Sequence, residues 1–211
     1  MDDPGKPFRR RGKELRERAF AALALIPLVP VFAVCALAIK LEGLFDREAR
    51  GPVFFVEDRI ARGQIIKLLK FRTLTASALA SLGPGPTHIA LLEMEGKVTR
   101  AGRTIRRWYL DELPQLINIA KGDMFLIGTR PAPIEYYEEE MAQGITRKRD
   151  MPAGLIGPVQ AAKGSPDFER GVELDQKYWE AFTTYSGWRL LLLDLRILAR
   201  SAKTQIEHKG V

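Results

Sequence analysis

Cysteine and histidine are nearly absent from this chain of 211 residues, which contains one cysteine, Cys35, and two histidines, His88 and His208. So few residues cannot form a Cys/His zinc cluster, and a single thiol cannot form a disulfide within the chain. Any chemistry must therefore rest on carboxylates, hydroxyls, lysines and arginines. The apolar content of 46% is sufficient for a hydrophobic core, which excludes intrinsic disorder, and the length fits one domain or a domain with an appendage.

Acidic residues are outnumbered, with 33 Lys plus Arg against 26 Asp plus Glu, a net charge of +7 and an isoelectric point near 9.6. Such an excess of positive charge predicts an anionic partner. Nucleic acid, anionic lipid and a phosphorylated substrate all fit, and charge alone does not choose among them. Interleaving of basic and aromatic residues is sparse, and no helix-turn-helix or single-strand-binding signature stands out, so we expect no nucleic-acid partner.

One long segment has no charged or strongly polar side chain. It runs over residues 19–39, and a helix of that length, at about 1.5 Å per residue, reaches roughly 30 Å, the thickness of a bilayer core. The residues after it lack a small-residue cleavage site, so we expect a membrane segment that is retained rather than a signal peptide that is removed. Pro27 and Pro30 interrupt the segment and predict a bend, because each removes a helical hydrogen bond.

Basic residues flank this segment on both sides, with seven Lys/Arg in residues 1–18 and eight in residues 40–72. The positive-inside rule places basic flanks in the cytoplasm, so the segment can enter and leave through one leaflet as a re-entrant hairpin. A kinked single span is the alternative, because prolines are tolerated in membrane helices and long domains translocate largely regardless of charge. The residues alone leave both topologies open.

A second membrane contact is predicted near the end of the chain, over residues 188–203. This segment is mostly apolar, and its four basic residues fall on one narrow stripe at about 100° per residue: Arg189, Arg196, Arg200 and Lys203. The pattern is typical of an amphipathic helix in the membrane interface, with a soluble-core helix that has one solvent-exposed edge as the alternative. Asp194 lies off the basic stripe and needs a partner or a cation if it is buried.

The remaining segments predict an α+β fold that is mostly helical, with a few short strands. A strand is expected at residues 52–56, and residues 65–71 are either a second strand or an apolar stretch of ambiguous structure. A loop is expected at 81–87, and helices at 104–109, 114–120, 134–141 and 174–182. Strands and helices do not alternate as a doubly wound sheet requires.

Two adjacent carboxylates, Asp111 and Glu112, stand just before Pro114. An acidic pair before a proline is typical of a helix start, which is the purely structural interpretation. Adjacent side chains in a regular helix or strand diverge by about 100° or 180°. The pair can therefore serve one site only at an irregular junction, which Pro114 supplies.

Such a pair also needs cations nearby, because two carboxylates about 4 Å apart repel by a few kcal/mol at an effective dielectric constant near 20. Arg106 and Arg107 precede the pair, and Arg130 follows in a stiff Gly-Thr-Arg-Pro turn. Guanidinium groups suit bidentate phosphate binding, and Mg²⁺ is typically held by one or two carboxylates plus substrate phosphates. The residues therefore predict a site for a phosphorylated substrate with Mg²⁺.

Five motifs follow the proline-broken segment in this order: Val53-Phe54-Phe55, Lys70-Phe71-Arg72-Thr73, Asp111-Glu112-Leu113-Pro114-Gln115-Leu116, Lys121-Gly122-Asp123-Met124 and Arg130-Pro131. With them the chain resembles the bacterial sugar transferases, the monotopic phosphoglycosyl transferases. The resemblance runs from about residue 18 to residue 200, and the string over residues 110–124 is its most specific part.

The resemblance implies that Pro30 is the kink of a re-entrant helix with both ends in the cytoplasm, at the inner membrane of a bacterium. It also implies a reaction, in which a sugar 1-phosphate moves from a nucleotide sugar, usually a UDP-sugar, to polyprenyl (undecaprenyl) phosphate and UMP is released. Asp111 is the implied nucleophile and Mg²⁺ ligand, through a covalent phosphosugar intermediate, and Glu112 would position phosphates or handle the acceptor's proton. An aspartate, with a reference pKa of about 3.9, needs no base to act as a nucleophile at neutral pH.

Substrate contacts are expected from arginines and motif residues around the pair: Arg72, Arg106, Gln115, Arg130, Pro131 and Arg149. For Arg72 and Arg149 an ordinary surface charge or a structural ion pair is the alternative. The expected partners are the UDP-sugar, the polyprenyl phosphate and the lipid bilayer, with homo-oligomerisation left open. The expected division of the chain is a basic segment 1–18, a re-entrant helix 19–41, a catalytic domain 42–200 including the interfacial helix 188–203, and a tail 204–211.

The chain also departs from the family's motifs. Ala21 stands where an acid is usual, and Val29 stands where a serine usually precedes the kink proline. Further departures in residues 57–61, 95–97 and 153–160 lie where the protein could recognise the nucleotide or the sugar. The sequence therefore does not predict which sugar is transferred. The departures at Ala21 and Lys97 keep open a degenerate family member that only scaffolds a glycan-assembly complex. The net charge of +7 keeps open another hypothesis, a membrane-anchored basic binding module without catalysis.

Overall fold

The computed structural model describes residues 10–82, 97–162 and 168–207, so the predicted loop 81–87 lies mostly outside the described residues. Most of the described chain is helical, with two small sheets, as predicted. Its elements in order are α1 (Arg11–Phe45), η1 (Arg47–Ala49), β1 (Phe54–Ala61), β2 (Gln64–Phe71), α2 (Ala76–Ser81), α4 (Arg100–Arg107), η2 (Leu110–Glu112), α5 (Gln115–Lys121), β3 (Phe125–Ile127), α6 (Ile134–Ala142), α7 (Arg147–Asp150), β4 (Gly154–Ile156), α8 (Phe168–Thr184) and α9 (Gly187–Glu207).

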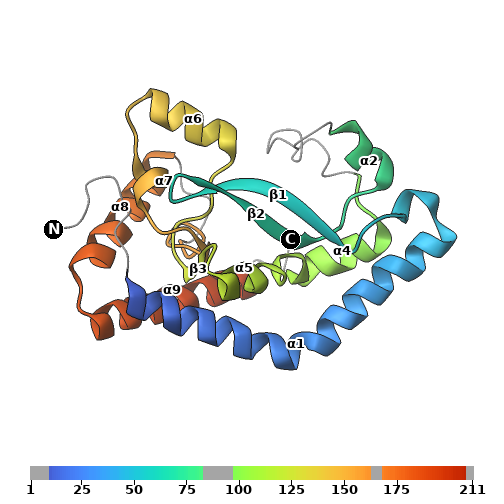
Figure 1. Ribbon diagram of the computed structural model, residues 1–211, viewed down its shortest axis with the longest axis horizontal. Coiled ribbons are helices and arrows are strands. Elements are labelled where there is room, and N and C mark those ends of the chain that lie inside the picture. The colour runs from blue at the N-terminus through green and yellow to red at the C-terminus, as the bar shows by residue number, and fades with distance from the viewer. Residues whose placement is uncertain (1–9, 83–96, 163–167, 208–211) are drawn as a thin grey trace.

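The elements form layers across the molecule. Helix α1 runs along one edge, α4, α5 and α9 lie next to it, and the β1–β2 hairpin follows (Figure 1). Helices α2 and α6 lie on the far side of the hairpin from α1. The protein therefore has an α1 side and an α6 side, with the hairpin and α5 between them.

Helix α1 packs on the rest of the protein along one side only. Ala21 is buried against α5 and β2, and Cys35 and Ile39 are buried against α4 and β2. Large apolar side chains elsewhere on the helix are exposed: Phe20, Leu23, Ile26, Val29, Val34 and Leu37. By length and apolar content the helix could cross a membrane. These properties are those of a membrane anchor that also belongs to the protein core.

The course of α1 differs from a straight rod and from the predicted bounds. Figure 1 shows the helix bending about midway along its length, and Pro27 and Pro30 lie inside it. The helix begins at Arg11 and ends at Phe45, so it extends beyond the predicted residues 19–41 at both ends. Its first two turns belong to what the sequence suggested was a separate basic segment.

The two predicted strands pair as one antiparallel hairpin, with Phe54 opposite Phe71. Arg62 and Gly63 form the turn with φ angles of 53° and 71°. A two-residue turn with both φ values positive matches the natural twist of a hairpin. The first strand continues to Ala61, beyond the predicted residue 56, because the charged residues in its second half are paired within the sheet.

The second sheet holds the turn that carries Arg130. Strands β3 and β4 are parallel and are connected through α6 and α7. Gly128 and Gly154 bring the two backbones so close that a Cβ atom added to Gly154 would lie 2.2 Å from the Gly128 nitrogen. A larger residue at either position would therefore push the turn after β3 away from β4.

Helix α9 joins α8 and β3 in a common core, built from Phe125, Ile127, Tyr178, Phe182 and Leu190, among others. Its exposed side carries an apolar stripe at helical spacing: Trp188, Leu191, Leu192 and Leu195. This exposed stripe favours the interfacial helix over the soluble-core alternative.

The expected partner for Asp194 is present. Asp194 is 5% exposed and accepts hydrogen bonds from Lys13 Nζ at 2.6 Å and from the Tyr178 hydroxyl at 2.8 Å. Burial and the charge of Asp194 raise the pKa of Tyr178 well above its ordinary value, so the hydroxyl stays protonated and donates. Lys13 also pairs with Glu17 at 2.5 Å, and Glu17 accepts a hydrogen bond from the Leu126 amide. This cluster ties α1, α8, α9 and β3 together.

Candidate functional site

The irregular junction predicted for the carboxylate pair is confirmed. Helix α4 ends before Tyr109, whose backbone is left-handed with a φ of 54°, and the short 3-10 helix η2 carries Asp111 and Glu112. Helix α5 begins after Pro114. The predicted helix 104–109 is wrong at its end because the chain reverses its backbone conformation at Tyr109 to enter the junction.

Asp111 is partly buried at this junction. Burial, and then the charge of Glu112, raise the pKa of Asp111 above its ordinary value, while Lys70 and Arg106 act in the opposite direction. The two carboxylates are therefore close enough to repel each other, and the nearby side chains offset that repulsion only in part. Further positive charge on a ligand would stabilise the ionised pair.

Two of the predicted arginines come to this junction from opposite directions. Arg130 Nη2 lies 3.0 Å from Glu112 Oε1, so the turn after β3 is paired with η2. Arg106 Nε donates to Thr73 Oγ1 at 2.9 Å, at the end of β2. Both guanidinium groups therefore have fixed positions beside the carboxylates.

Gln115 and Pro131 also lie at this place. Together with Arg130 and Glu112 they line a small recess, which Lys70 and Arg59 also line. The structure thus brings together the carboxylate pair and four of the six predicted substrate contacts, counting Arg106.

A buried carboxylate, Glu57, organises the cations of the hairpin. It pairs with Arg59 at 2.5 Å and with Lys70 at 2.8 Å. Burial alone would raise its pKa, but Lys70 and Arg59 together lower it, so Glu57 is ionised. Sequence reasoning named none of the three as a site residue, although their spacing held a signal: residues 57 and 59 face the same side of a strand.

Asn118 connects the hairpin to the helix that follows the carboxylates. Its side-chain oxygen accepts from the Leu69 amide at 3.0 Å, and its nitrogen donates to the Lys67 carbonyl at 2.8 Å and to Asp123 at 2.9 Å. These bonds hold α5 against β2, the strand that carries Lys70. Sequence reasoning missed Asn118, because nothing local distinguishes it from a surface asparagine.

The donor groups at the junction fit Mg²⁺ as a cation shared with a substrate. Within the ranges the structure describes, no three or more His, Cys, Asp or Glu side chains are grouped as a metal cage. Mg²⁺ does not require one, since it commonly binds one or two carboxylates plus substrate phosphates and keeps several waters. The partly unrelieved repulsion between Asp111 and Glu112 is the feature that such a cation would relieve.

Comparison with known proteins identifies the family. A family model described as bacterial sugar transferase matches residues 8–208, nearly the whole chain. The chain belongs to the bacterial sugar transferases.

Relatives of this sugar transferase carry matching names. The UDP-glucose:undecaprenyl-phosphate glucose-1-phosphate transferase of Caulobacter vibrioides is 34% identical over 210 residues, which cover 94% of this chain and 72% of that protein. The UDP-N-acetylgalactosamine-undecaprenyl-phosphate N-acetylgalactosaminephosphotransferase of Aeromonas hydrophila is 30% identical over 221 residues, 100% of this chain and 46% of that protein. The galactosyl transferase CpsE of Streptococcus agalactiae is 31% identical over 163 residues, 72% of this chain and only 36% of that protein. The chain thus spans between about a third and three quarters of these relatives.

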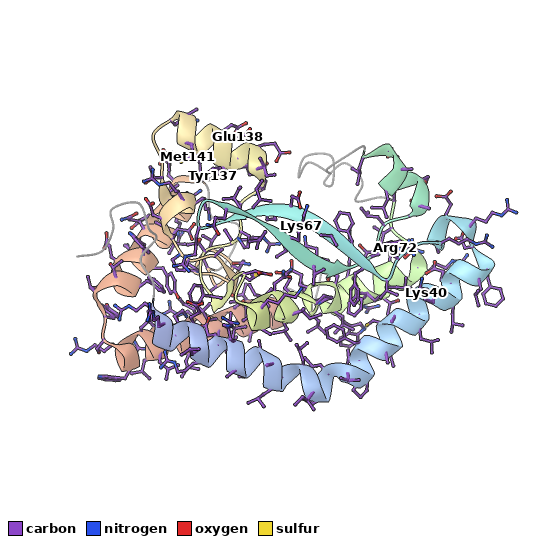
Figure 2. The ribbon with its side chains drawn as sticks, viewed as in Figure 1. Lys40, Lys67, Arg72, Tyr137, Glu138 and Met141 are labelled. Carbon is purple, nitrogen blue, oxygen red and sulfur yellow. The ribbon has the colours of Figure 1, made fainter. Side chains whose placement is uncertain are left out.

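The sugar transferase does not direct Arg72 into the recess. This side chain is 1% exposed, and its guanidinium donates to the carbonyl oxygens of Ala49, Pro52 and Leu74, the last two at 2.8 and 3.0 Å. Figure 2 shows Arg72 at the end of the hairpin near Lys40 of α1, away from α6. This geometry favours a structural role for Arg72. Its guanidinium fastens the end of β2 to the segment after α1.

Arg149 also has a structural partner. Its guanidinium contacts Asp150 at 2.8 and 3.2 Å on the surface of α7. Arg149 is missing from the described residues that line the recess beside Glu112. The structure therefore does not bring this arginine to the carboxylate pair.

The family's missing acid before the apolar segment has a local counterpart. Ala21 is fully buried and packs against α5, where a larger side chain would hold α1 away. One turn earlier, Glu17 Oε2 accepts a hydrogen bond of 2.8 Å from the Leu126 amide. The sugar transferase therefore still joins α1 to β3 through a carboxylate.

Proposed function

We propose that this sugar transferase moves a sugar 1-phosphate from a UDP-sugar to polyprenyl phosphate and releases UMP, at the cytoplasmic face of a bacterial inner membrane. The observation that carries the proposal is the partly buried Asp111 beside Glu112, at a junction reached by Arg106, Arg130 and Lys70. The names of the relatives supply the substrate classes, undecaprenyl phosphate and UDP-sugars.

The first step is attack on the donor. An ionised oxygen of Asp111 forms a bond to the phosphorus that carries the sugar, and the bond from that phosphorus to the bridging oxygen of UMP breaks. The electron pair leaves with UMP, and the sugar phosphate stays on Asp111 as an acyl phosphate. The ionised carboxylate carries no proton, so no base is needed in this step.

The second step returns the enzyme to its starting state. An oxygen of the polyprenyl phosphate attacks the same phosphorus, and the bond to Asp111 breaks to regenerate the carboxylate. Arg130 is held by Glu112 at 3.0 Å, so Glu112 positions the guanidinium that neutralises phosphate charge. Lys70 and Arg106 lower the charge repulsion between Asp111 and the incoming phosphates.

Asp111, together with the phosphates of the donor, would hold Mg²⁺, which when bound supplies positive charge that offsets the repulsion between the carboxylates and the diphosphate. The protein's own contribution is alignment. Tyr109, whose backbone is left-handed, and the following η2 fix the direction of the Asp111 carboxylate. The contact of Arg130 with Glu112 fixes the position of the Arg130 guanidinium.

The membrane topology is part of the proposal. We infer that α1 enters and leaves one leaflet as a re-entrant hairpin bent at its prolines, with the exposed apolar side chains of α1 and α9 in lipid. The support is the bend midway along α1 and its one-sided packing on α4 and α5 (Figure 1). A shallow helix of this kind would keep the carboxylate pair at the depth of lipid phosphates.

Turnover by the purified protein tests the reaction. With Mg²⁺, polyprenyl phosphate and a panel of UDP-sugars, we expect UMP release from at least one donor, and we expect loss of release with Asp111→Asn or with a chelator. Donor labelled in the sugar should leave a mass increase of one sugar phosphate on the peptide that contains Asp111. Normal turnover by Asp111→Asn would remove the nucleophile, and salt-sensitive binding to DNA with no UMP release would favour the non-catalytic alternative.

Cysteine labelling tests the topology. Gly12→Cys is suitable because nothing lies within 4 Å of a Cβ atom at this position, and Arg50→Cys reports the other end of α1. Both are placed in a Cys35→Ala background, because Cys35 is the chain's single native thiol. A re-entrant helix requires both cysteines to react from the cytoplasmic side, and labelling from opposite sides would establish a full span.

A further inference from the structure

A cleft of about 390 Å³ opens beside the carboxylate pair, between the turn of residues 130–133 and helix α6. This volume lies within the range of about 300–1,000 Å³ typical of small-molecule sites. Pro131, Pro133 and Tyr136 contribute apolar surface to its lining, beside charged and polar side chains. Tyr136 is 40% exposed and lines the cleft, so a ligand in the cleft can contact it.

The cleft continues the recess at the carboxylate pair. Arg59, Arg130 and Pro131 line both spaces. A donor with its diphosphate at Arg130 and its reacting phosphorus at Asp111 can therefore extend one end into the cleft without leaving the protein surface.

The position of the cleft matches a water-soluble ligand. Helix α6 lies on the far side of the hairpin from α1 (Figure 1), and Figure 2 shows its residues Tyr137, Glu138 and Met141 on that side. The exposed apolar side chains of α1 lie on the opposite edge. The lipid acceptor thus approaches from the α1 side, and the nucleotide donor approaches from the α6 side.

The charges at the back of the cleft favour a neutral group over another phosphate. Arg147 makes a bidentate contact with the buried Glu140 and a second ion pair of 2.8 Å with Asp175. Lys148 pairs with Asp175 at 3.0 Å and donates to the Arg130 carbonyl at 3.2 Å. These two cations are thus paired with carboxylates, as are the two guanidinium groups shared with the recess, Arg59 with Glu57 and Arg130 with Glu112.

Hydrogen-bonding groups line the same face of α6 as Tyr136. Glu139 and Gln143 follow at intervals of three and seven residues, which places all three on one side of the helix. A carboxylate can accept from the two hydroxyls of a ribose, and an amide can pair with the donor and acceptor edge of a pyrimidine base.

We propose that this cleft binds the uridine of the donor, with the base stacked on Tyr136, its edge bonded to Gln143 and the ribose near Glu139. The inference rests on the proposed function for the identity of the nucleotide. A ring packed against an aromatic face and prolines, with polar groups at its edge, is a common way to bind a base. UMP would then be the product that leaves from this cleft after Asp111 has taken the sugar phosphate.

Binding of UMP to the full-length protein tests the cleft without turnover. The dissociation constant of UMP is measured by calorimetry for the parent protein, Tyr136→Ala and Gln143→Leu, each in the same detergent. We expect each variant to bind UMP about tenfold more weakly, the loss typical of a stacking or edge contact. Tyr185→Ala and Gln176→Leu are matched controls, because both side chains are exposed on or just after α8, outside the cleft, and both should bind UMP like the parent.

Two results would overturn the inference. One is unchanged UMP affinity in both α6 variants while their melting temperatures match the parent. The other is unchanged inhibition by UMP together with a raised KM for the UDP-sugar, which would place the sugar in the cleft instead of the nucleoside. A variant that melts early is replaced by Tyr136→Leu, which keeps an apolar side chain but removes the ring, or by Gln143→Glu, which keeps the size of the side chain but removes the amide NH2 donor.

The proposal that the cleft binds uridine and the proposed reaction can be tested separately. Tyr136→Ala could lose UMP binding although the parent protein forms no sugar phosphate adduct with any donor. This result would support the cleft as the UMP site and contradict the proposed reaction. The parent protein could release UMP while the Tyr136 and Gln143 variants bind UMP normally. This result would support the reaction and contradict the proposal that the cleft binds the uridine. Asp111→Asn should bind UMP in either case.

Discussion

The ammonium of Lys13 lies 2.6 Å from the Asp194 carboxylate, joining two residues that are 181 positions apart in the chain. Both side chains are almost fully buried, at 1% and 6% exposure. The pair joins the first turns of α1 to α9. The Tyr178 hydroxyl extends the contact to the Ile127 carbonyl at 3.0 Å, directly before the turn that carries Arg130.

Removing one partner of this pair should destabilise the whole protein. For Lys13→Met we expect a loss of about 3–5 kcal/mol, the usual cost of leaving a buried charge without its partner, because Asp194 and Glu17 both lose this cation, and we expect a smaller loss for Asp194→Asn, in which Lys13 keeps Glu17. Thermal unfolding in detergent, followed by circular dichroism, measures the change. Lys177→Met, which breaks the exposed pair of Lys177 with Glu173, is the control and should melt within about 0.5 kcal/mol of the parent. An Asp194→Asn protein as stable as that control would show that the ion pair has little importance.

The pKa of Glu57 predicts sensitivity to acid. Its folded-state pKa is lowered by Lys70 and Arg59, so the ionised form stabilises the fold above the ordinary carboxyl pKa, and this stabilisation is lost as the pH falls through the lowered value. We expect Glu57→Gln to be about 3 kcal/mol less stable near pH 7 and to lose less further stability than the parent on acidification. Denaturant unfolding at a series of pH values gives the dependence of the unfolding free energy on pH for both proteins. Parallel curves for the two proteins would contradict the assigned pKa direction.

Lys148 should act on the reaction through Arg130. Because its ammonium donates to the Arg130 carbonyl at 3.2 Å, Lys148→Met is expected to loosen the turn and lower kcat/KM for the UDP-sugar about tenfold, or about 1.4 kcal/mol. If Lys148 acts through Arg130, the double variant with Arg130→Gln should be no slower than Arg130→Gln alone. Multiplied losses in the double variant would instead mean that the two side chains act independently.

Helix α9 should place Trp188 at the depth of lipid headgroups. Trp188 is 63% exposed at the start of the apolar stripe, so in a Trp108→Phe and Trp179→Phe background its fluorescence should be quenched by brominated lipid. Leu192→Glu with Leu195→Glu places two charges on that stripe and should relieve the quenching, whereas Gln176→Glu on α8 should not. No quenching of Trp188 in the protein without the glutamates would place the stripe outside the lipid.

Much of the fold was predictable where the apolar pattern is local. The strand 65–71 and the helix 134–141 depend on neighbours in sequence, and the structure contains both. The need of Asp194 for a partner also followed from its place off the basic stripe. The identity of that partner did not, because Lys13 belongs to a segment whose other basic residues are typical of a solvated tail.

The candidate site divides in the same way. The junction at Asp111 and Glu112 followed from Pro114, which acts within three residues. Asn118 and Glu57 were missed because their partners lie 51 and 13 residues away. Arg72 was expected to contact substrate because its type suits phosphate, yet a guanidinium can equally use its donors on three backbone carbonyls, and only the packing of α1 against the hairpin decides which.

The early start of α1 limits how this protein can be shortened. Removing residues 1–41 to obtain a water-soluble enzyme would also remove Lys13 and Glu17, so the Asp194 carboxylate and the Leu126 amide would lose these partners. Helix α1 and the elements that it contacts therefore form a single folding unit. A protein shortened in this way is expected to unfold and to lose its activity for that reason.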